Sequence, residues 1–511
     1  MIELIQEKWN EYVFSKEILN WTETFESKTA LVDGNRRITY EELGKMVDYC
    51  WEKLEKIGLS KGDKVAVQME NHAEFVVCIL TFLAMGVIPI LILPAQKTRE
   101  IEGILKTVHP KMYIYDTKNK HIEKLIEENH ICFGKLDKAF FSQAIDVRMR
   151  ISKKGQHSIH PINPDDVALL LLSGGTTGIP KLIPRTHGDY IYNVQKVSQR
   201  CKVNDQSIFL AVIPMAHNFA LANPGLLGTL MNGGTVVICP DAAPIEIFSL
   251  IEKEKVTYMA LVPSILKMCM AYRNIDDCDD LSSLEMILVG GAMLQEETAR
   301  KVDAVLNGKL IQVFGTAEGL ICMNSPDDTY EIRVSCQGRP ISELDQIKIV
   351  DENGNEVLKG EIGELITKGP YTIRDYYLLS DQQGYFNEDG FYLTGDKARV
   401  VHGGNIQILG RVREQINRAG EKIMPSEVEE IIQRNPNIID CAVVGVEDSI
   451  LGNRICAYVT CRKEIGLDEM REFLTDEGLA SFKLPDTLKI VEQFPYTAVG
   501  KIDKKKLCDL L

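Results

Sequence analysis

The sequence lacks the features that would assign it to several common classes of binding protein. Its 58 Lys and Arg residues are outnumbered by 73 Asp and Glu residues, which gives a formal net charge of -15. Proteins that bind nucleic acids usually need a basic face to displace counterions from phosphates, and a charge of this sign repels polyanions. We therefore expect no nucleic-acid partner.

The 13 cysteines include no Cys-x-x-Cys pair and form no tight cluster with histidine. This scatter disfavours a zinc site or a redox pair and is typical of free thiols in a reducing compartment. The opening stretch, "MIELIQEKWN", lacks the basic start and apolar core of a secretory signal. The sequence therefore predicts a cytoplasmic protein.

One apolar stretch, residues 75–95, is long enough to cross a bilayer. Gly86, Pro89 and Pro94 interrupt it, and residues 73–85 are better explained as a buried helix that leads into a buried strand over 87–93. We therefore expect no membrane insertion.

With 511 residues, the chain is too long for one ordinary hydrophobic core. From about residue 60, short β-rich runs alternate with helix-length segments, which predicts an α/β fold of layered subdomains. After Gly338 the pattern predicts a β-rich subdomain with a hairpin at "ENGN", residues 352–355. We expect a large N-terminal lobe over residues 1–410 and a small, mobile α+β lobe over 411–511, joined by a hinge at 410–414. In the small lobe, Ser426 is expected to cap a helix, with Glu429 three residues later.

A loop rich in glycine and hydroxyl groups, "SGGTTGIPK" at residues 173–181, follows an apolar strand. Backbone N–H groups in such a loop can converge on one anion, and Lys181 adds a charge that neutralises phosphate oxygens. A plain surface turn is the alternative, but the concentration of donors favours a phosphate site. The P-loop pattern is not met, because Leu182 stands where a metal-binding hydroxyl would follow the lysine.

Five ordered motifs extend this interpretation: "SGGTTGIPK", "FGTAEG", "YLTGD", "GRVREQINRAGEKI" and "PYTAVGKIDKK". Together they resemble the adenylate-forming superfamily of acyl-CoA ligases, luciferases and peptide-synthetase adenylation domains. The stretches "AHNFALANPG" and "KGPYTIRDYY" make the chain most similar to the stand-alone 2,3-dihydroxybenzoate-AMP ligases of siderophore pathways. The resemblance implies that an aromatic carboxylate and ATP form an acyl-adenylate with release of pyrophosphate. The aryl group then passes to the phosphopantetheine thiol of an aryl carrier protein.

The resemblance also implies roles for individual residues. The cofactors would be ATP and Mg²⁺, with Glu318 supporting the metal. Lys501 would bridge the substrate carboxylate and the α-phosphate, and Lys181 would hold the outer phosphates. The ATP site would comprise Ser173, Gly174, Gly175, Thr176, Thr177, Gly178, Lys181, Gly291, Val313, Phe314, Gly315, Asp396, Arg411 and Lys501. The aryl-acid pocket would comprise His217, Asn218, Phe219, Asn223 and Ile321.

Plainer interpretations stand beside these roles. Phe314 could be core packing, Asp396 a turn residue, Lys501 a solvated lysine and His217 a structural histidine. In the same family, Arg413 would occupy the hinge, and "RAGEKI" around Gly420 would replace Lys501 in the second step.

The identity of the acid and of the acceptor stays open at this point. Asn218 favours an ortho-hydroxyl acid, but Asn223 replaces the usual serine and Ile321 the usual valine of the family pocket. We expect 2,3-dihydroxybenzoate first and salicylate next. The lysines of "GKIDKKK", which are Lys501, Lys504, Lys505 and Lys506, are a candidate docking patch for an acidic carrier, with a merely solubilising tail as the alternative. An aryl-CoA ligase that uses free CoA and a non-catalytic binding protein remain as alternatives, although Lys181, Glu318, Asp396, Arg411 and Lys501 are all present.

Overall fold

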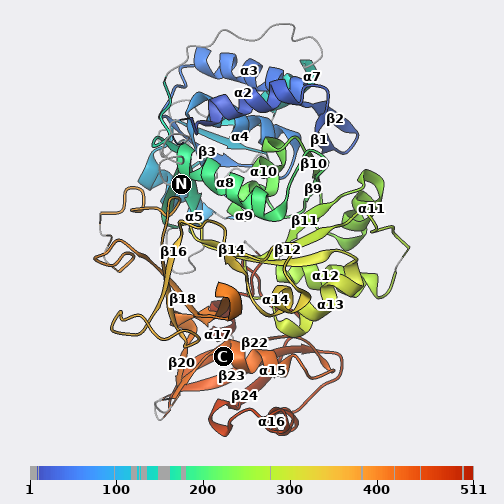
Figure 1. Cartoon of the computed structure of the whole chain (residues 1–511), viewed down its shortest axis with the longest axis vertical. Coiled ribbons are helices and arrows are strands. Elements are labelled where there is room, and N and C mark those ends of the chain that lie inside the picture. Colours follow the sequence, from blue (N-terminus) through green and yellow to red (C-terminus); the bar gives the residue numbers. More distant parts are fainter. Residues whose placement is uncertain are drawn as a thin grey trace.

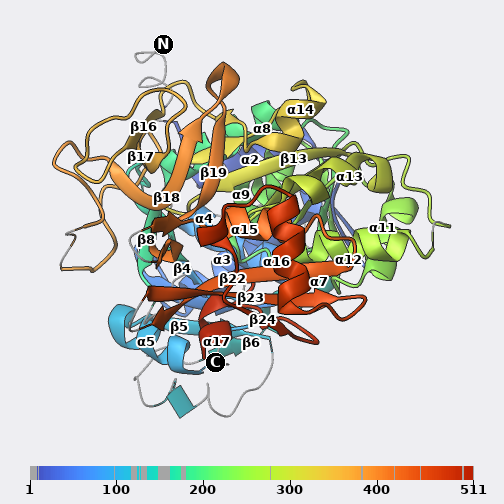
Figure 2. The same cartoon turned by 90° about the horizontal axis from the view of Figure 1, so that it is seen from below.

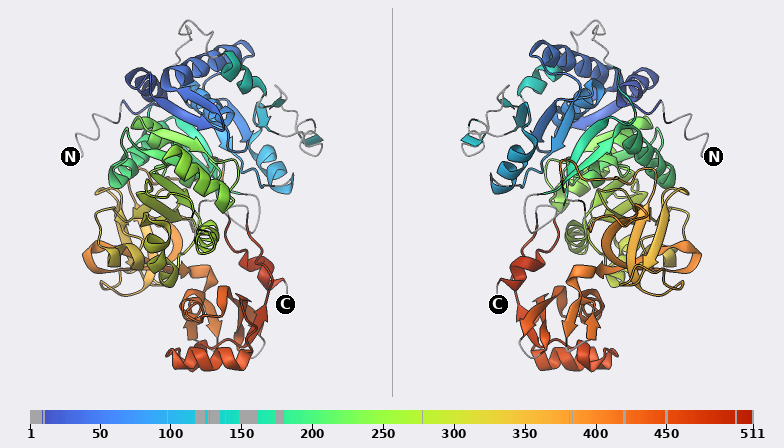
Figure 3. Two further views of the ribbon diagram at one scale, coloured as in Figure 1. Left: turned by 90° about the vertical axis from the view of Figure 1, so that its right-hand side faces the viewer. Right: turned by 90° about the vertical axis from the view of Figure 1, so that its left-hand side faces the viewer.

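The computed structural model describes residues 9, 11–96, 98–116, 124–125, 127, 135–137, 139–147, 161–173, 180–276, 278–380, 382, 384–418, 421–448, 451–497 and 500–509. Two large sheets with helices between and around them make up the upper part of the molecule (Figure 1). A four-stranded sheet joins these to a smaller unit at the opposite end, which carries the C-terminus (Figure 3). The α/β prediction with a large and a small lobe is confirmed.

The nine-stranded sheet has a parallel centre, because strands β13 to β1 of its order all run in one direction. Antiparallel strands close both of its edges. In spatial order its strands are β15 (Arg339–Pro340), β14 (Ile321–Met323), β13 (Lys309–Gly315), β12 (Met286–Gly290), β11 (Tyr258–Leu261), β9 (Ile208–Ala211), β10 (Thr235–Ile238), β1 (Thr29–Asp33) and β2 (Arg36–Thr39).

The six-stranded sheet is parallel except for its last strand, which returns antiparallel after the glycine-rich loop. Its order is β6 (Lys135–Asp137), β5 (Met112–Tyr115), β3 (Lys64–Gln68), β4 (Ile88–Leu91), β7 (Val167–Leu172) and β8 (Leu182–Thr186). The helices of this part of the chain are α2 (Phe14–Thr24), α3 (Tyr40–Lys56), α4 (Ala73–Met85), α5 (Thr98–Val108), α7 (Ala139–Val147), α8 (His187–Cys201), α9 (Asn218–Ala222), α10 (Gly225–Met231), α11 (Pro244–Glu254), α12 (Pro263–Arg273), α13 (Glu296–Leu306) and α14 (Tyr330–Ser335).

Helix α4 explains the long apolar stretch. All of its residues are buried, because α2, α3 and α7 pack around it (Figure 1). It ends at Gly86, whose φ of 70° lies in the left-handed region that favours glycine. The predicted helix has the predicted bounds, and the strand that follows is shorter than predicted. Among the described residues, no helix is both long and apolar enough to span a membrane.

The β-rich subdomain is an antiparallel sheet of β16 (Gln346–Val350), β17 (Gly363–Lys368), β18 (Tyr392–Val400) and β19 (Ile406–Arg411). The predicted turn at "ENGN" is present, since the Asp351 N–H donates to the Asn355 carbonyl at 2.9 Å. The turn closes the predicted hairpin, because Glu356 forms an antiparallel bridge with Val350 and the Val357 N–H donates to the Ile349 carbonyl at 2.9 Å; β17, the next strand of the sheet, begins at Gly363.

The small lobe follows a 3-10 turn at Val412–Glu414. It contains a hairpin of β20 (Ile416–Arg418) and β21 (Glu421–Ile423) and a sheet in the order β22 (Ile438–Asp448), β23 (Gly452–Cys461), β24 (Thr487–Ile490). Its helices are α15 (Pro425–Ile432), α16 (Leu467–Asp476) and α17 (Lys504–Cys508), which cluster around this sheet in the view from below (Figure 2).

The helix cap expected at Ser426 is wrong. Helix α15 begins at Pro425, whose fixed φ suits the first helical position, and Met424 precedes it without a side-chain cap. The Ser426 hydroxyl instead donates to the Leu409 carbonyl of β19. It therefore ties the small lobe to the end of the β-rich sheet.

Candidate active site

The predicted site residues gather at the carboxyl edge of the nine-stranded sheet. The loops after β9, β12 and β13 leave this edge and carry the predicted residues His217, Gly291 and Glu318 in turn. In open α/β sheets, ligands bind in the crevice outside the carboxyl ends of the strands.

The residues predicted to hold adenine come together through strand pairing. Gly290 of β12 pairs with Val313 of β13, so Gly291 lies beside Phe314 and Gly315. Gly291 has φ of 83°, which a side chain would strain. Phe314 is only partly buried, against the core of the β-rich subdomain. These residues can line a flat ligand, and their assignment to adenine stays a prediction.

The glycine-rich loop is closed at its base. The Ser173 N–H donates to the Lys181 carbonyl at 2.9 Å, and the Lys181 N–H donates to Ser173 Oγ at 2.9 Å. Residues Gly174, Gly175, Thr176, Thr177 and Gly178 lie outside the described residues. Ser173 and Lys181 therefore mark where this loop starts and ends.

Lys181 lies in an aromatic setting. Its Nζ is 4.1 Å from the ring centre of Tyr376 and 3.8 Å from that of Tyr385. Burial lowers the pKa of Lys181, and the Arg413 charge lowers it too, whereas Glu318 raises it. Ring faces and a nearby carboxylate surround the ammonium, which has no hydrogen-bonded partner among the residues that the structure describes.

Glu318 is buried, and its Oε1 accepts a hydrogen bond from Tyr376 Oη at 2.7 Å. Tyr376 therefore contacts both charged residues: its hydroxyl donates to the Glu318 carboxylate, and its ring packs against the Lys181 ammonium. No group of three or more His, Cys, Asp or Glu that could hold a metal occurs in the described ranges. A single buried carboxylate fits Mg²⁺ that takes its other ligands from phosphates and water, and it does not fit an all-protein cage.

Asp396 and Arg411 face each other across β18 and β19. Arg411 Nε is 2.9 Å from Asp396 Oδ1, while the buried Oδ2 has no hydrogen-bond partner in the part of the chain that is described. Burial raises the pKa of Asp396 to about 6, against the opposing charges of Arg411 and Lys501. A buried acceptor without a donor fits a ligand that brings hydroxyl groups.

Lys501 enters the site from the small lobe. The Ser264 hydroxyl, at the start of α12, donates to the Gly500 carbonyl at 3.0 Å, which docks the lysine loop onto the large lobe. Burial lowers the pKa of Lys501; Arg411 lowers it further, and Asp396 and Glu414 raise it. The fold thus brings Lys501 to Asp396 and Arg411, about a hundred residues earlier in the chain.

Lys501 also lies close to the predicted acid pocket. Burial lowers the pKa of His217 to about 4, and the Lys501 charge adds to this effect. His217 Nδ1 accepts from the Phe219 N–H at 3.2 Å, which places the proton of the neutral ring on Nε2. The Phe219 ring lies against Gly290, since a Cβ there would be 3.3 Å from Cε1 of that ring.

The remaining pocket residues differ in burial and in the hydrogen bonds that their side chains make. Asn218 Oδ1 accepts from Tyr190 Oη at 2.7 Å. Asn223 is buried; its Oδ1 accepts from Asn193 Nδ2 at 3.0 Å, and its Nδ2 donates to the Asn218 carbonyl at 3.1 Å. Ile321 on β14 is buried beside Gly315. Asn223 therefore supports α9, and one of its two side-chain N–H groups has no partner among the described residues.

Sequence reasoning gave no role to Tyr376, Tyr190 or Asn193. Tyr376 stands in "KGPYTIRDYY", and the other two stand in "THGDYIYN" beside the glycine-rich loop. The first motif indicated the family, but the contacts of each of these side chains depend on strand and helix packing that cannot be predicted from the sequence.

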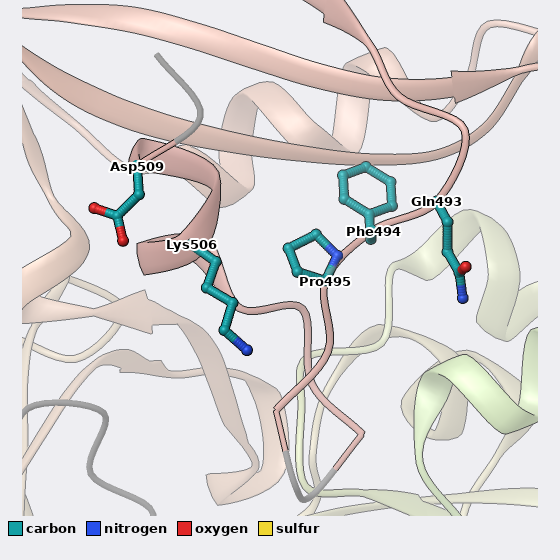
Figure 4. Close-up of a pocket in the computed structure, with 5 residues that line it drawn as sticks. All are labelled: Gln493, Phe494, Pro495, Lys506 and Asp509. Atoms are coloured by element: carbon teal, nitrogen blue, oxygen red, sulfur yellow. The ribbon is translucent and has the colours of Figure 1, made fainter.

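Lys504 does not belong to an exposed docking patch. Its Nζ is 2.8 Å from Glu429 Oε1 and 3.3 Å from Glu414 Oε2. Burial lowers the pKa of Lys504, but these two carboxylates outweigh burial and raise it. Lys505 and Lys506 are exposed, and Lys506 flanks a hollow lined by Gln493, Phe494, Pro495 and Asp509 (Figure 4).

Comparison with known proteins agrees with this geometry. The family description "AMP-binding enzyme" matches residues 19–377, and "AMP-binding enzyme C-terminal domain" matches residues 427–501. The chain is 39% identical over 493 residues to the 2,3-dihydroxybenzoate-AMP ligase of Bacillus subtilis, with 94% of this chain and 90% of the relative covered.

Two further similarities cover the same length. A salicylyl-CoA synthase / salicylate adenylyltransferase of Streptomyces sp is 38% identical over 509 residues, with 96% of this chain and 92% of the relative covered. The apo structure of Mycobacterium smegmatis MbtA superposes with a TM-score of 0.74 at 34% identity and covers 98% of this chain and 95% of its own. The chain therefore belongs to the AMP-binding enzymes, the family whose large and small domains both match it in sequence.

Proposed function

We propose that this enzyme is an aryl-acid AMP ligase: it uses ATP to convert an ortho-hydroxylated aromatic acid into an aryl-adenylate and then passes the aryl group to a thiol. The observation that carries the proposal is the meeting of Lys501 from the small lobe with Asp396 of the large lobe and with Arg411 at the end of β19. The similarity to an enzyme named 2,3-dihydroxybenzoate-AMP ligase points to the acid class.

In the first step, a carboxylate oxygen of the acid attacks the α-phosphorus of ATP. The bond from that phosphorus to the bridging oxygen breaks, and pyrophosphate leaves with the electron pair. Two anions must approach one another, so the step needs positive charge at the point of contact. Lys501 would supply it between the carboxylate and the α-phosphate, and Lys181 would neutralise the outer phosphates.

The nucleotide would be placed by residues of the large lobe. Asp396 would accept hydrogen bonds from the ribose hydroxyls with its unpartnered Oδ2, and Phe314 with Gly291 would line the adenine. Arg411 would hold Asp396 and reach toward the phosphate. Mg²⁺, held by Glu318 and phosphate oxygens, would withdraw charge from the leaving pyrophosphate when bound.

The acid would lie between α9 and the end of β13. His217 is uncharged at neutral pH because its pKa is lowered to about 4, and its Nε2–H can donate to the carboxylate. Asn218 would meet the ortho substituent, while Phe219 and Ile321 would line the ring. 2,3-Dihydroxybenzoate is the first candidate and salicylate the second, because one N–H of Asn223 remains to meet a 3-hydroxyl.

In the second step, a thiolate sulfur attacks the carbonyl carbon of the aryl-adenylate, and AMP leaves. We infer a separate aryl carrier protein as the acceptor, in siderophore or related nonribosomal peptide synthesis. Free CoA is the alternative, which the name of the Streptomyces relative brings forward. The small lobe, beginning near Arg411, would turn about Val412–Glu414 so that Lys501 leaves and the segment around Gly420 takes its place.

A pyrophosphate-release panel tests the proposal. The purified enzyme with ATP and Mg²⁺ is given benzoate, salicylate, 2,3-dihydroxybenzoate, 3-hydroxypicolinate and 3-hydroxyanthranilate. Release that depends on an ortho-hydroxyl acid is expected, and release with none of the acids would contradict the proposed activity. Adding either a phosphopantetheinylated aryl carrier or free CoA then separates the two acceptors.

A further inference from the structure

One face of helix α8 supports the predicted acid pocket from behind. Tyr190 and Asn193 are three residues apart on this helix, so their side chains project to the same side. Tyr190 donates to the side chain of Asn218, and Asn193 donates to Asn223, which in turn donates to the Asn218 carbonyl. Asn218 is therefore held through both its side chain and its backbone.

The bond from Tyr190 decides which way the Asn218 amide points. Tyr190 is fully buried, and Asn218 Oδ1 at 2.7 Å is the acceptor for its hydroxyl among the described residues. If the amide turned over, the hydroxyl would face an N–H group and its own hydrogen would have no acceptor. Because an unmade hydrogen bond in a buried site is costly, the observed orientation is favoured by about tenfold or more.

The Tyr190 hydroxyl keeps its proton throughout the working range. Burial raises the pKa of Tyr190, the Arg185 charge lowers it and Asp189 raises it, with a net upward shift. With Oδ1 engaged, Asn218 presents Nδ2, which has no hydrogen-bond partner in the part of the chain that the structure describes. The pocket therefore offers a donor at this point.

A donor on the protein discriminates between two common ortho substituents. An ortho-hydroxyl donates its hydrogen to the neighbouring carboxylate and presents an oxygen lone pair outward. An ortho-amino group also donates one hydrogen to the carboxylate, but it presents its second N–H outward because its lone pair is delocalised into the ring. An acid with an ortho-amino group would therefore place its outward N–H against an Nδ2–H of Asn218.

On these grounds we propose that Tyr190 is a specificity-determining residue that makes the enzyme select ortho-hydroxyl over ortho-amino aromatic acids by fixing the Asn218 amide with its N–H toward the substrate. This rests on the proposed function and deepens it. Tyr190 does not touch the acid and acts through Asn218.

The test compares kcat/KM for pyrophosphate release with salicylate and with anthranilate in the wild-type enzyme, Y190F and Y113F. Tyr113 on β5 is the matched control, since it is also fully buried and donates to a side-chain amide oxygen, that of Gln68, at 2.7 Å. We expect the wild type and Y113F to favour salicylate by about tenfold or more. In Y190F the amide is free to turn, so the ratio should fall at least about fivefold, mainly through a gain with anthranilate.

The outcomes separate this inference from the proposed function. A wild-type enzyme that releases pyrophosphate but treats the two acids alike, or prefers anthranilate, would overturn the role of Tyr190 and leave the ligase activity standing. If Y190F keeps the wild-type ratio of kcat/KM for the two acids, the role of Tyr190 is overturned and the ligase activity again stands. If no acid supports pyrophosphate release, the ligase proposal fails, and calorimetric titration of the wild type with the two acids then tests the selectivity alone. If Y190F does not fold, N218D is measured instead: its carboxylate offers no N–H to the acid, so a preference for salicylate equal to that of the wild type would overturn the inference.

Discussion

Lys267 of α12 and Asp440 of β22 form an ion pair, with 2.7 Å between Nζ and Oδ1, that joins the large lobe to the small lobe. The pair is shielded, since the side chains are 26% and 16% exposed. Ser264, on the same helix, holds the Gly500 carbonyl next to Lys501. One helix of the large lobe thus fixes the small lobe at two points in the orientation that delivers Lys501.

Reversing one charge of this pair should slow adenylation selectively. In K267E, two carboxylates would face each other, and the orientation with Lys501 in the site would be less populated. We expect aryl-adenylate formation to fall about three- to tenfold, while thiol transfer from supplied aryl-AMP keeps its rate or rises. The swapped double variant K267E/D440K should recover most of the loss.

The matched control is K255E, which breaks the exposed Lys255–Asp280 pair within the large lobe. An equal loss in both half-reactions, or no recovery in the double variant, would show that the Lys267–Asp440 pair has a general structural role instead.

Replacing Lys501 should separate the two half-reactions more sharply. K501A removes the cation whose charge acts on Asp396 and His217, so pyrophosphate release should fall about a hundredfold or more. Transfer of the aryl group from supplied aryl-AMP should stay within a few fold of the wild type. Single-turnover assays of each half-reaction give the answer, with K505A as the control, and parallel loss of both would refute the division of labour.

Asp396 should make ATP binding and stability respond to pH in opposite ways. Its pKa is raised from 3.8 to about 6 in the folded protein, so between about pH 4 and 6 the folded state holds a proton that the unfolded state has lost. The stabilising contribution of this proton is present below pH 4 and is lost as the pH rises through 6. ATP affinity should instead fall as the pH drops below 6, because a protonated carboxyl is a poorer acceptor for ribose hydroxyls.

The variant D396N tests both effects. It should raise the free energy of unfolding in urea by about 1 to 3 kcal/mol at pH 7.5 and by less at pH 5, while it weakens ATP binding at pH 7.5. A stabilisation that is the same at both pH values would show that the carboxyl titrates in its ordinary range.

Lys504 of α17 should behave differently from its exposed neighbours Lys505 and Lys506. K504M leaves Glu429 and Glu414 without their shared cation and should cost about 2 to 4 kcal/mol in the free energy of unfolding. The double variant K505E/K506E changes exposed charges only, so it should leave stability and adenylation near the wild type. If Lys505 and Lys506 help to dock an acidic carrier, K505E/K506E should slow aryl loading at low salt. Equal loading rates for K505E/K506E and the wild type would remove this patch as the docking site.

Features that follow from the residue types within one segment could be predicted from the sequence. The apolar run of α4 predicted a wholly buried helix with the observed bounds, because only a helix packed on all sides is apolar on all sides. The family motifs named Lys181, Glu318, Asp396, Arg411 and Lys501 as one charge system, and the fold brings these side chains to the same edge of the sheet or close to it.

Partners that depend on long-range packing could not be read from the sequence. Ser426 matched a capping pattern, yet Pro425 takes the first helical position and the hydroxyl bonds to Leu409. Lys504 looked like its exposed neighbours until the turn at Val412–Glu414 and α15 brought two carboxylates to it.

The sequence by itself determined which chemical groups this protein carries: a donor-rich loop ending in lysine, the carboxylates of Glu318 and Asp396 and a lysine near the C-terminus. Only the tertiary structure decided how these groups are tuned. Tyr190 orients Asn218, Tyr376 joins Lys181 to Glu318, and Lys267 holds Asp440 across the lobes. The physical reason is that residue type fixes charge and hydrogen-bonding capacity, whereas the partner of each group depends on the order of strands in a sheet and on the docking of one lobe against the other.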